Sequence, residues 1–186
     1  MSAHIVFAKG PPVTTLEADP PWMHGDKLPG PKRGAEKHYA GGVLTLSEIC
    51  RFPLPELAQD AWLFLWTLHT HRREAMIVAE VWGFKAVIKG EMVWEKTTRA
   101  GNVSTGMGRT VRMAHEVCLI FKRGRPVRHS ASVRSVFRAE RREHSRKPDE
   151  FYERVSLLVG PDGRKVSLFA REKREGWECY GDEVEP

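Results

Sequence analysis

The sequence has little cysteine and no long apolar run. Its three cysteines, Cys50, Cys118 and Cys179, are widely spaced and form no C-x-x-C pair, which argues against a disulfide framework and a thiolate metal site. No apolar stretch approaches the roughly 20 residues that span a bilayer. The N-terminal segment MSAHIVFAKGPPV also lacks the apolar core of a signal peptide. We therefore expect a protein of a reducing, cytoplasmic compartment with no membrane partner.

Patterns of metal ligands are equally scarce. His69 and His71 lie at the end of a predicted strand, but no carboxylate or cysteine follows at ligand spacing. His115-Glu116 lacks the second histidine of an H-E-x-x-H site. We predict no metal site, and we expect Glu116 to support a pocket.

Positive charge, by contrast, is plentiful. The chain has 186 residues, 41% of them hydrophobic, and a formal net charge of +6, which indicates one soluble domain with a basic surface. The excess is densest in one segment, opposed by Glu140 and Glu143. This basic run comprises Lys122, Arg123, Arg125, Arg128, Arg134, Arg138, Arg141, Arg142, Arg146 and Lys147. It is either a solvated face or, in the interpretation we prefer, a surface that faces phosphate groups.

Strand and helix patterns alternate along the chain. Strand character marks residues 15–19, 61–68, 85–96, 115–124, 135–140 and 164–171. Helical spacing marks residues 71–83 and 147–159. A capping box formed by Thr45 and Glu48 predicts the start of a further, short helix. Residues 175–186 look irregular. This alternation predicts an α/β fold with a mostly parallel sheet and helices on its faces. In such sheets, sites gather at the carboxyl ends of the strands.

The segment EADPPW, residues 17–22, ends the first predicted strand. Two consecutive prolines have no backbone donors, so we expect the Asp19 and Pro20 carbonyls to be free acceptors beside the flat face of Trp22. Such a set suits a planar ligand that carries an amino group, such as adenine or cytosine. Acceptors on both N–H bonds of that amine would also aim its lone pair at an electrophilic methyl group. The alternative is a proline-stiffened turn with a core tryptophan.

Lys147 stands at or just before the N-terminus of a predicted helix. Pro148, Asp149 and Glu150 are favourable in a first helical turn. A cation is disfavoured at that end of a helix unless it meets an anion there. Lys147 therefore marks a site for a carboxylate or phosphate, unless its side chain simply turns to solvent.

Taken together, these segments resemble the adenine N6-methyltransferases with a D-P-P-W catalytic motif, the MT-A seventy-kilodalton-subunit family. The resemblance runs in the family's order through EADPPW, HYAGGVLTLSEI, DAWLFLWTL, EVWGFKAVIKGEMVWEK, GMGRTVRMAHEVCLIFKRG, HSRKPDEFY, VSLFAR and GWECYGDEV. It implies a Rossmann-like fold with permuted motif order, which accounts for the lack of a G-x-G-x-x-G fingerprint. It also implies a single methyltransferase domain over residues 13–186 after an N-terminal extension over residues 1–12.

The resemblance implies S-adenosylmethionine as cofactor and assigns residues to it. Asp19, Pro20, Pro21 and Trp22 would hold the target adenine, and Asp19 would also lie near the methionine amine of the cofactor. The other implied cofactor residues are Lys147 for the carboxylate, Phe169 and Arg171 for the ribose, and Asp182 and Glu183 in the last segment. Asp182 stands where family members commonly carry asparagine, and it can accept from ribose hydroxyls but cannot donate.

Two glycine-rich loops, from His24 to Gly42 and from Thr97 to Ala114, resemble the family's substrate loops. Tyr39 is a candidate for base stacking, and Arg99, Arg109 and Arg112 are candidates for phosphate contacts. The expected substrate is adenine in nucleic acid, flipped from a duplex or in a single strand. DNA is preferred because no RNA-binding module is appended. RNA methylation and a catalytically silent nucleic-acid-binding module stay as alternatives, and a homo- or heterodimer is compatible with either.

Overall fold

The computed structural model describes residues 5–23, 42–106, 110–142 and 146–184. These residues build a seven-stranded sheet with the strand order β5-β3-β4-β2-β1-β6-β7. The strands are β1 (Val13–Ala18), β2 (Leu57–Thr67), β3 (Lys85–Thr97), β4 (His115–Arg123), β5 (Val136–Glu140), β6 (Arg164–Leu168) and β7 (Glu178–Tyr180). The helices are α1 (Leu46–Cys50), the 3-10 turn η2 (His69–His71), α2 (Arg72–Val81) and α3 (Asp149–Val159).

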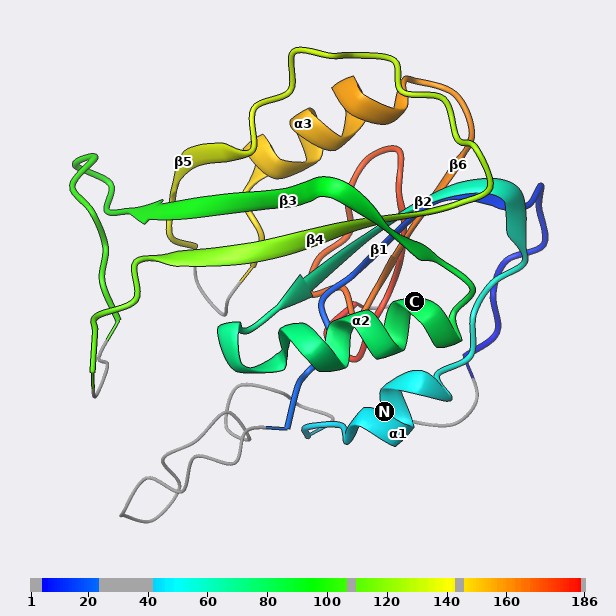
Figure 1. The fold of residues 1–186 in the computed structure, drawn as a ribbon, viewed down its shortest axis with the longest axis horizontal. Coiled ribbons are helices and arrows are strands. Elements are labelled where there is room, and N and C mark those ends of the chain that lie inside the picture. Colours follow the sequence, from blue (N-terminus) through cyan, green and yellow to red (C-terminus); the bar gives the residue numbers. More distant parts are fainter. Residues whose placement is uncertain (1–4, 24–41, 107–109, 143–145, 185–186) are drawn as a thin grey trace.

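The sheet is mostly parallel, as the sequence predicts. β1 pairs in parallel with β2 and β6, as do β3 with β5 and β6 with β7, whereas β4 runs antiparallel between β2 and β3. In Figure 1, α1 and α2 lie on one face of the sheet and α3 lies on the other. The predicted α/β fold with helices on both faces is therefore confirmed.

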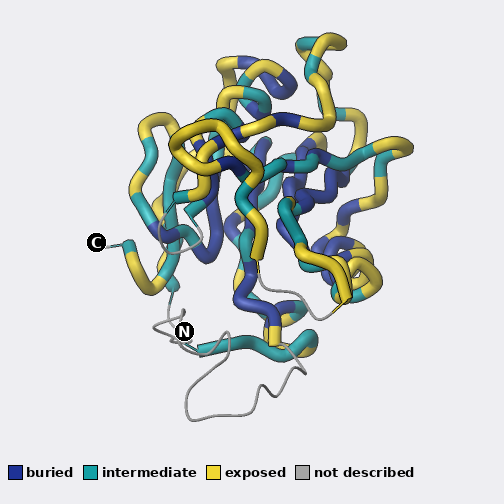
Figure 2. Tube along the Cα trace, turned by 90° about the vertical axis from the view of Figure 1, so that its left-hand side faces the viewer, coloured by how far each residue is buried: buried dark blue, intermediate teal, exposed yellow. Residues whose placement is uncertain are grey.

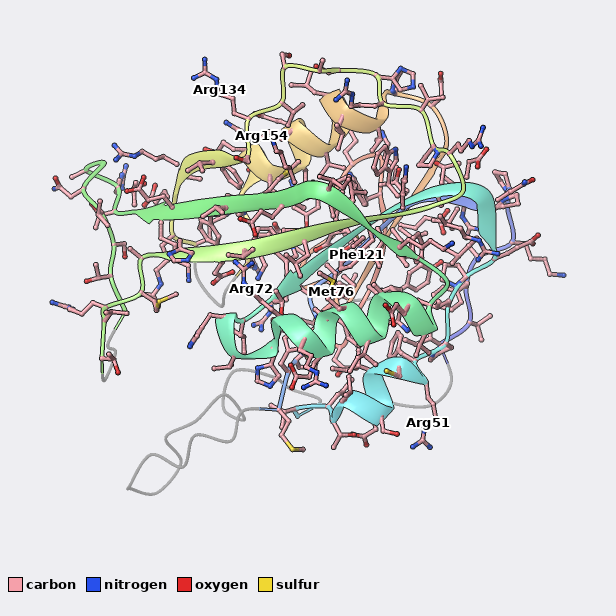
Figure 3. The ribbon with its side chains drawn as sticks, in the orientation of Figure 1. Arg51, Arg72, Met76, Phe121, Arg134 and Arg154 are labelled. Carbon is pink, nitrogen blue, oxygen red and sulfur yellow. The ribbon has the colours of Figure 1, made fainter. Side chains whose placement is uncertain are left out.

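The central strands are buried on both faces because their alternate residues enter different cores. In β2, Leu63 and Leu65 join the core under α1 and α2, while Phe64 and Trp66 join the core under α3. Strand β4 divides in the same way, and its Phe121 lies between the sheet and α2 (Figure 3). Figure 2 shows that buried residues concentrate in these inner strands, with exposed residues outside them. An unbroken apolar sequence is what such a strand requires.

The boundaries of the helices follow their sequences. Thr45 and Glu48 form the predicted capping box at the start of α1, and α2 ends just before Gly83, whose φ of 84° favours glycine. Pro148 occupies the N-cap of α3, and Phe151 and Val155 anchor that helix to the sheet. The described residues contain no helix that is long and apolar enough to cross a membrane.

One predicted irregular region is wrong. Within residues 175–186, Glu178–Tyr180 form β7, which pairs in parallel with β6 at the edge of the sheet. Three residues of mixed polarity give no period in the sequence, so the pairing depends on the neighbouring strand. The carboxyl ends of β1, β2, β3, β6 and β7 point to one edge of the sheet, and the candidate site lies there.

Candidate active site

The D-P-P-W segment forms a tight turn directly after β1. The Trp22 N–H donates to the Pro20 carbonyl at 2.8 Å, and the Leu44 N–H donates to the Pro21 carbonyl at the same distance. The prediction of a free Pro20 carbonyl is therefore wrong, since the turn itself uses one lone pair of that oxygen. The Asp19 N–H donates to the Leu168 carbonyl at 3.3 Å, which ties the start of the turn to β6.

Trp22 is buried, with 4% of its surface exposed. Its indole N–H donates to the Trp66 carbonyl at 3.0 Å, and its ring lies 5.6 Å from that of His71. The prediction that the flat face of Trp22 is open for stacking is therefore wrong. The turn directs the indole into the core under α1 and α2. Trp22 instead fixes the turn against the end of β2.

Lys147 and Asp19 meet across 128 positions of sequence. The Lys147 ammonium donates to Asp19 Oδ2 at 2.7 Å and lies 3.0 Å from Glu116 Oε2. It also lies 4.8 Å from the centre of the Trp66 ring, a cation–π distance. Only 8% of Lys147 is exposed, so the alternative of a solvated lysine is excluded.

Glu116 holds this pair in place, as the sequence predicts for a residue that supports a pocket. Its other oxygen lies 2.5 Å from the Lys96 ammonium, so carboxylates and ammonium groups alternate from β3 to β1. Burial by itself raises the pKa of Glu116, but the positive charges of Lys147 and Lys96 outweigh burial and lower that pKa to about 2. Glu116 is therefore ionised at neutral pH.

A pocket beside the Asp19–Lys147 pair brings together four of the six predicted cofactor residues. Asp19, Lys147, Phe169 and Arg171 all line it. Phe169 follows β6 with a left-handed φ of 60°, a conformation that a bulky residue rarely adopts and that is found where a site imposes strain. The backbone thus directs Phe169 and Arg171 to the same cavity.

The other two predicted cofactor residues lie in the turn after β7. Asp182 and Glu183 are exposed there and lie outside the set of described residues that line the pocket. Glu183 still connects to it, because its Oε1 lies 3.5 Å from an Arg171 nitrogen.

Several residues of the pocket, above all Glu17, were not predicted from the sequence. Glu17 lies in β1, two positions before Asp19, which directly follows that strand, and Glu17 is buried in the pocket lining. Other missed lining residues are Arg146, Tyr152, Ser167, Glu172 and Arg174. A sequence signal for Glu17 does exist: Thr15, Glu17 and Asp19 place polar side chains at every second position of a strand, which is one face.

The candidate phosphate contacts lie partly within the described residues. Arg99 and Arg112 are exposed on the loop that leaves the carboxyl end of β3 (Figure 1). Because β3 runs in the same direction as β1, this loop starts at the edge of the sheet where β1 ends. Tyr39 and Arg109 lie outside the described residues, so their roles stay predictions.

The basic run is not one continuous surface. Arg146 and Lys147 line the pocket, and Arg138 donates to Glu95 at 2.7 Å. Arg134 points away from the molecule on the side of α3 (Figure 3). The interpretation as a phosphate-facing surface therefore applies to the exposed members at most.

His71 has both ring nitrogens engaged. Nε2 lies 3.0 Å from the Met23 carbonyl, which can only accept, so Nδ1 accepts from the Thr70 hydroxyl at 2.8 Å. Within the part of the chain that the structure describes, no three His, Cys, Asp or Glu side chains gather as metal ligands.

Comparison with known proteins agrees with this geometry. The chain is 32% identical over 171 residues to an N(6)-adenosine-methyltransferase MT-A70-like protein of Arabidopsis thaliana, covering 90% of this chain and 23% of that protein. It is 31% identical to the N(6)-adenosine-methyltransferase catalytic subunit METTL3 of Homo sapiens, a match that covers 90% of this chain and 27% of that protein. It is 28% identical to the type II methyltransferase M.MunI of a Mycoplasma species, and this match covers 91% of this chain and 76% of that protein.

The chain thus spans about a quarter of the length of the plant and human relatives. The MT-A70 family profile matches residues 15–183, which include every strand of the sheet except the start of β1. The chain therefore belongs to the MT-A70 family of S-adenosylmethionine-dependent adenine N6-methyltransferases.

Proposed function

We propose that this protein transfers a methyl group from S-adenosylmethionine to the N6 amine of adenine in DNA. The observation that carries the proposal is the placement of Asp19-Pro20-Pro21-Trp22 at the carboxyl end of β1, with Asp19 paired to Lys147 at the rim of a polar pocket. Catalysis by such a site depends on positioning and on fixed charges.

The pocket residues fit the cofactor chemically. Lys147, Arg146 and Arg174 supply positive charge for a carboxylate, and Asp19 and Glu172 supply negative charge for an ammonium group. Two buried polar atoms of the lining, Arg146 Nε and Glu17 Oε1, have no hydrogen-bond partner among the described residues. Buried polar groups without partners are costly, which favours a ligand that completes them.

The chain's own residues position the acceptor amine. S-adenosylmethionine, when bound, supplies an electrophilic methyl group on a sulfonium sulfur. Asp19 offers carboxylate and carbonyl oxygens to the amine, and Pro20 offers the second lone pair of its carbonyl. Two hydrogen bonds of Trp22 hold those acceptors in place: its backbone N–H donates to the Pro20 carbonyl, and its indole N–H donates to the Trp66 carbonyl. Lys147 fixes the Asp19 side chain, and Glu116 fixes Lys147.

The preference for DNA is supported by the name of one relative. M.MunI, of which the chain covers 76%, is a type II methyltransferase, a designation of DNA-modifying enzymes. We assign Arg99 and Arg112, which are exposed on the loop between β3 and β4, as phosphate contacts for either nucleic acid.

The test is product identification. The protein is incubated with methyl-labelled S-adenosylmethionine and matched DNA and RNA pools, which are then digested to nucleosides. We expect labelled N6-methyl-deoxyadenosine. Label in RNA adenosine alone would overturn the DNA preference, labelled methylcytosine would overturn the adenine assignment, and cofactor binding without any product would favour a silent module.

Two substitutions connect this activity to the site. Asp19→Asn and Lys147→Met should each lower the rate of methyl transfer by about a hundredfold or more, the scale seen when a fixed electrostatic group is removed. Glu80→Gln, an exposed change on the solvent side of α2, is the matched control and should leave the rate unchanged. Equal rates in all three variants would contradict the assigned site.

A further inference from the structure

Glu17 is the most deeply buried acidic residue of the cofactor pocket. Only 1% of Glu17 is exposed, and it lines the same pocket as Asp19. The two residues are two positions apart, which is the repeat of one face of a strand. Glu17 and Ser167 are direct partners in the β1–β6 register. Its position therefore places a carboxyl group, and not an apolar side chain, at the inner wall of the site.

The two oxygens of Glu17 differ in their surroundings. Oε2 accepts a hydrogen bond from the Ser167 hydroxyl. Oε1 is buried and has no hydrogen-bond partner among the described residues. A residue that served merely to join β1 to β6 would gain nothing from this second oxygen, whose burial is costly. The unsatisfied atom belongs to a pocket that is built for a ligand.

Burial moves the pKa of Glu17 upward, toward neutral pH. Burial raises its pKa from 4.5 to about 8, Asp19 adds to the rise, and Ser167, Lys147 and Arg174 oppose it. The Glu17 charge also affects three other titratable groups, Cys118, Tyr152 and Cys179. Burial raises the pKa of each, and the negative charge of Glu17 adds to the rise. These three groups stay un-ionised between pH 6 and pH 8.

The lining without the Glu17 charge is rich in cations. Lys147 and three arginines, Arg146, Arg171 and Arg174, face two carboxylates, Asp19 and Glu172. S-adenosylmethionine brings a further positive charge on its sulfur, whereas the product that remains after methyl transfer is a neutral thioether. Ionised Glu17 would be a third carboxylate, and its negative charge would compensate the positive sulfur of S-adenosylmethionine. The product has no such positive charge for Glu17 to compensate.

We propose that Glu17 is the residue by which the pocket distinguishes S-adenosylmethionine from its demethylated product, because it gives up its proton when the sulfonium cofactor binds. This inference rests on the proposed function, since it takes S-adenosylmethionine as the ligand. The balance is simple: the Glu17 carboxyl and the cofactor cation give a carboxylate–sulfonium pair and one proton, which passes to the buffer. No covalent bond to the cofactor forms or breaks in this step.

The consequence is proton-linked binding of one cofactor form. At pH 7 an unliganded carboxyl with a pKa near 8 is ionised in about a tenth of the molecules, so binding that requires the carboxylate strengthens as pH rises. Between pH 6 and pH 8 the ionised fraction of such a carboxyl rises from about one in a hundred to about one half, so the affinity for S-adenosylmethionine should rise about fiftyfold through Glu17. The affinity for S-adenosylhomocysteine should lack this component.

Isothermal titration calorimetry tests the inference without methyl transfer. Each cofactor form is titrated into the wild type and into Glu17→Gln at pH 7, in two buffers of different ionisation enthalpy, so that the heat reports the protons released. We expect the wild type to release close to one more proton with S-adenosylmethionine than with S-adenosylhomocysteine. Glu17→Gln retains an acceptor for the Ser167 hydroxyl and should release the same number with both ligands.

Ser167→Ala provides a second variant at the same contact. The Ser167 hydrogen bond lowers the pKa of Glu17, so its loss should move the rise in S-adenosylmethionine affinity to higher pH. Equal proton release by the wild type and Glu17→Gln, or an unmoved pH profile in Ser167→Ala, would overturn the role of Glu17. Failure of the wild type to bind S-adenosylmethionine at any pH would instead overturn the proposed function itself.

Discussion

At the residue scale, Glu116 lies between the ammonium groups of Lys96 and Lys147, 2.5 and 3.0 Å away. Glu116→Gln removes the negative charge that both share while it keeps the size of the side chain. Because Lys147 keeps Asp19 as a partner, the free energy of unfolding at pH 7 should fall by about 2 kcal/mol, below the usual cost of a fully broken buried pair. Urea denaturation measures this difference.

The pH dependence of this loss has a defined sign. The pKa of Glu116 in the folded protein, about 2, lies below its ordinary value of 4.5, so the stabilisation is present above pH 4.5 and is lost as pH falls toward 2. Glu91→Gln, which removes an exposed pair with Arg72, is the control and should change stability by less than about 0.5 kcal/mol. A Glu116→Gln deficit that persists unchanged at pH 2.5 would contradict the electrostatic cause.

Local sequence patterns predict some residues of the site but not others. Asp19 and Lys147 could be predicted because prolines after a strand and a cation before a helix are local anomalies. Glu17 could be noticed but not interpreted, since its surroundings come from distant parts of the chain. β6 pairs with β1 beside it, and Tyr152 of α3 lines the same pocket. The buried orientation of Trp22 likewise depends on Trp66 of β2.

At the element scale, Gly181 controls how closely the segment after β7 approaches the segment after β6. A Cβ atom at this position would lie 2.0 Å from the Ala170 carbonyl oxygen and 2.7 Å from its nitrogen. Gly181→Ala should therefore displace the backbone between Phe169 and Arg171, lower stability by about 1–3 kcal/mol and weaken S-adenosylmethionine binding about tenfold or more. Thermal unfolding and calorimetric titration measure the two effects.

Gly106→Ala is the matched control for that substitution. Its added Cβ would lie 3.6 Å from the Met113 carbonyl, an ordinary contact, so the change in stability should stay within about 0.5 kcal/mol. If Gly181→Ala bound the cofactor as well as Gly106→Ala does, the segment after β7 would have no part in the pocket.

Long elements were more predictable than short ones. Most of β2 is predictable because the unbroken apolar run over residues 61–68 fits a strand buried on both faces. The helical spacing over residues 71–83 predicts α2, but it does not define the buried face. Ala75, Val78 and Ala79 pack in the core, whereas the apolar side chains of Met76 and Val81 are exposed. The three residues of β7 gave no such pattern, and their strand geometry comes from pairing with β6.

At the scale of the whole molecule, Glu17 makes the fold sensitive to alkaline pH. The pKa of Glu17 in the folded protein, about 8, lies above its ordinary value of 4.5, so folding favours the protonated carboxyl. The contribution is fully present below pH 4.5 and is lost as pH rises to about 8. Integrated over that range, the loss amounts to at most about 5 kcal/mol.

Glu17→Gln removes this dependence because an amide does not ionise. The variant should match the wild type in free energy of unfolding near pH 4.5 and exceed it by several kcal/mol at pH 8.5, as measured by urea denaturation without cofactor. Saturating S-adenosylmethionine should narrow the gap at pH 8.5, because the ligand then stabilises the wild-type carboxylate that burial disfavours. A constant difference between the two proteins from pH 4.5 to pH 8.5 would show that Glu17 is ionised in the folded protein throughout, against both its burial and its proposed role in binding.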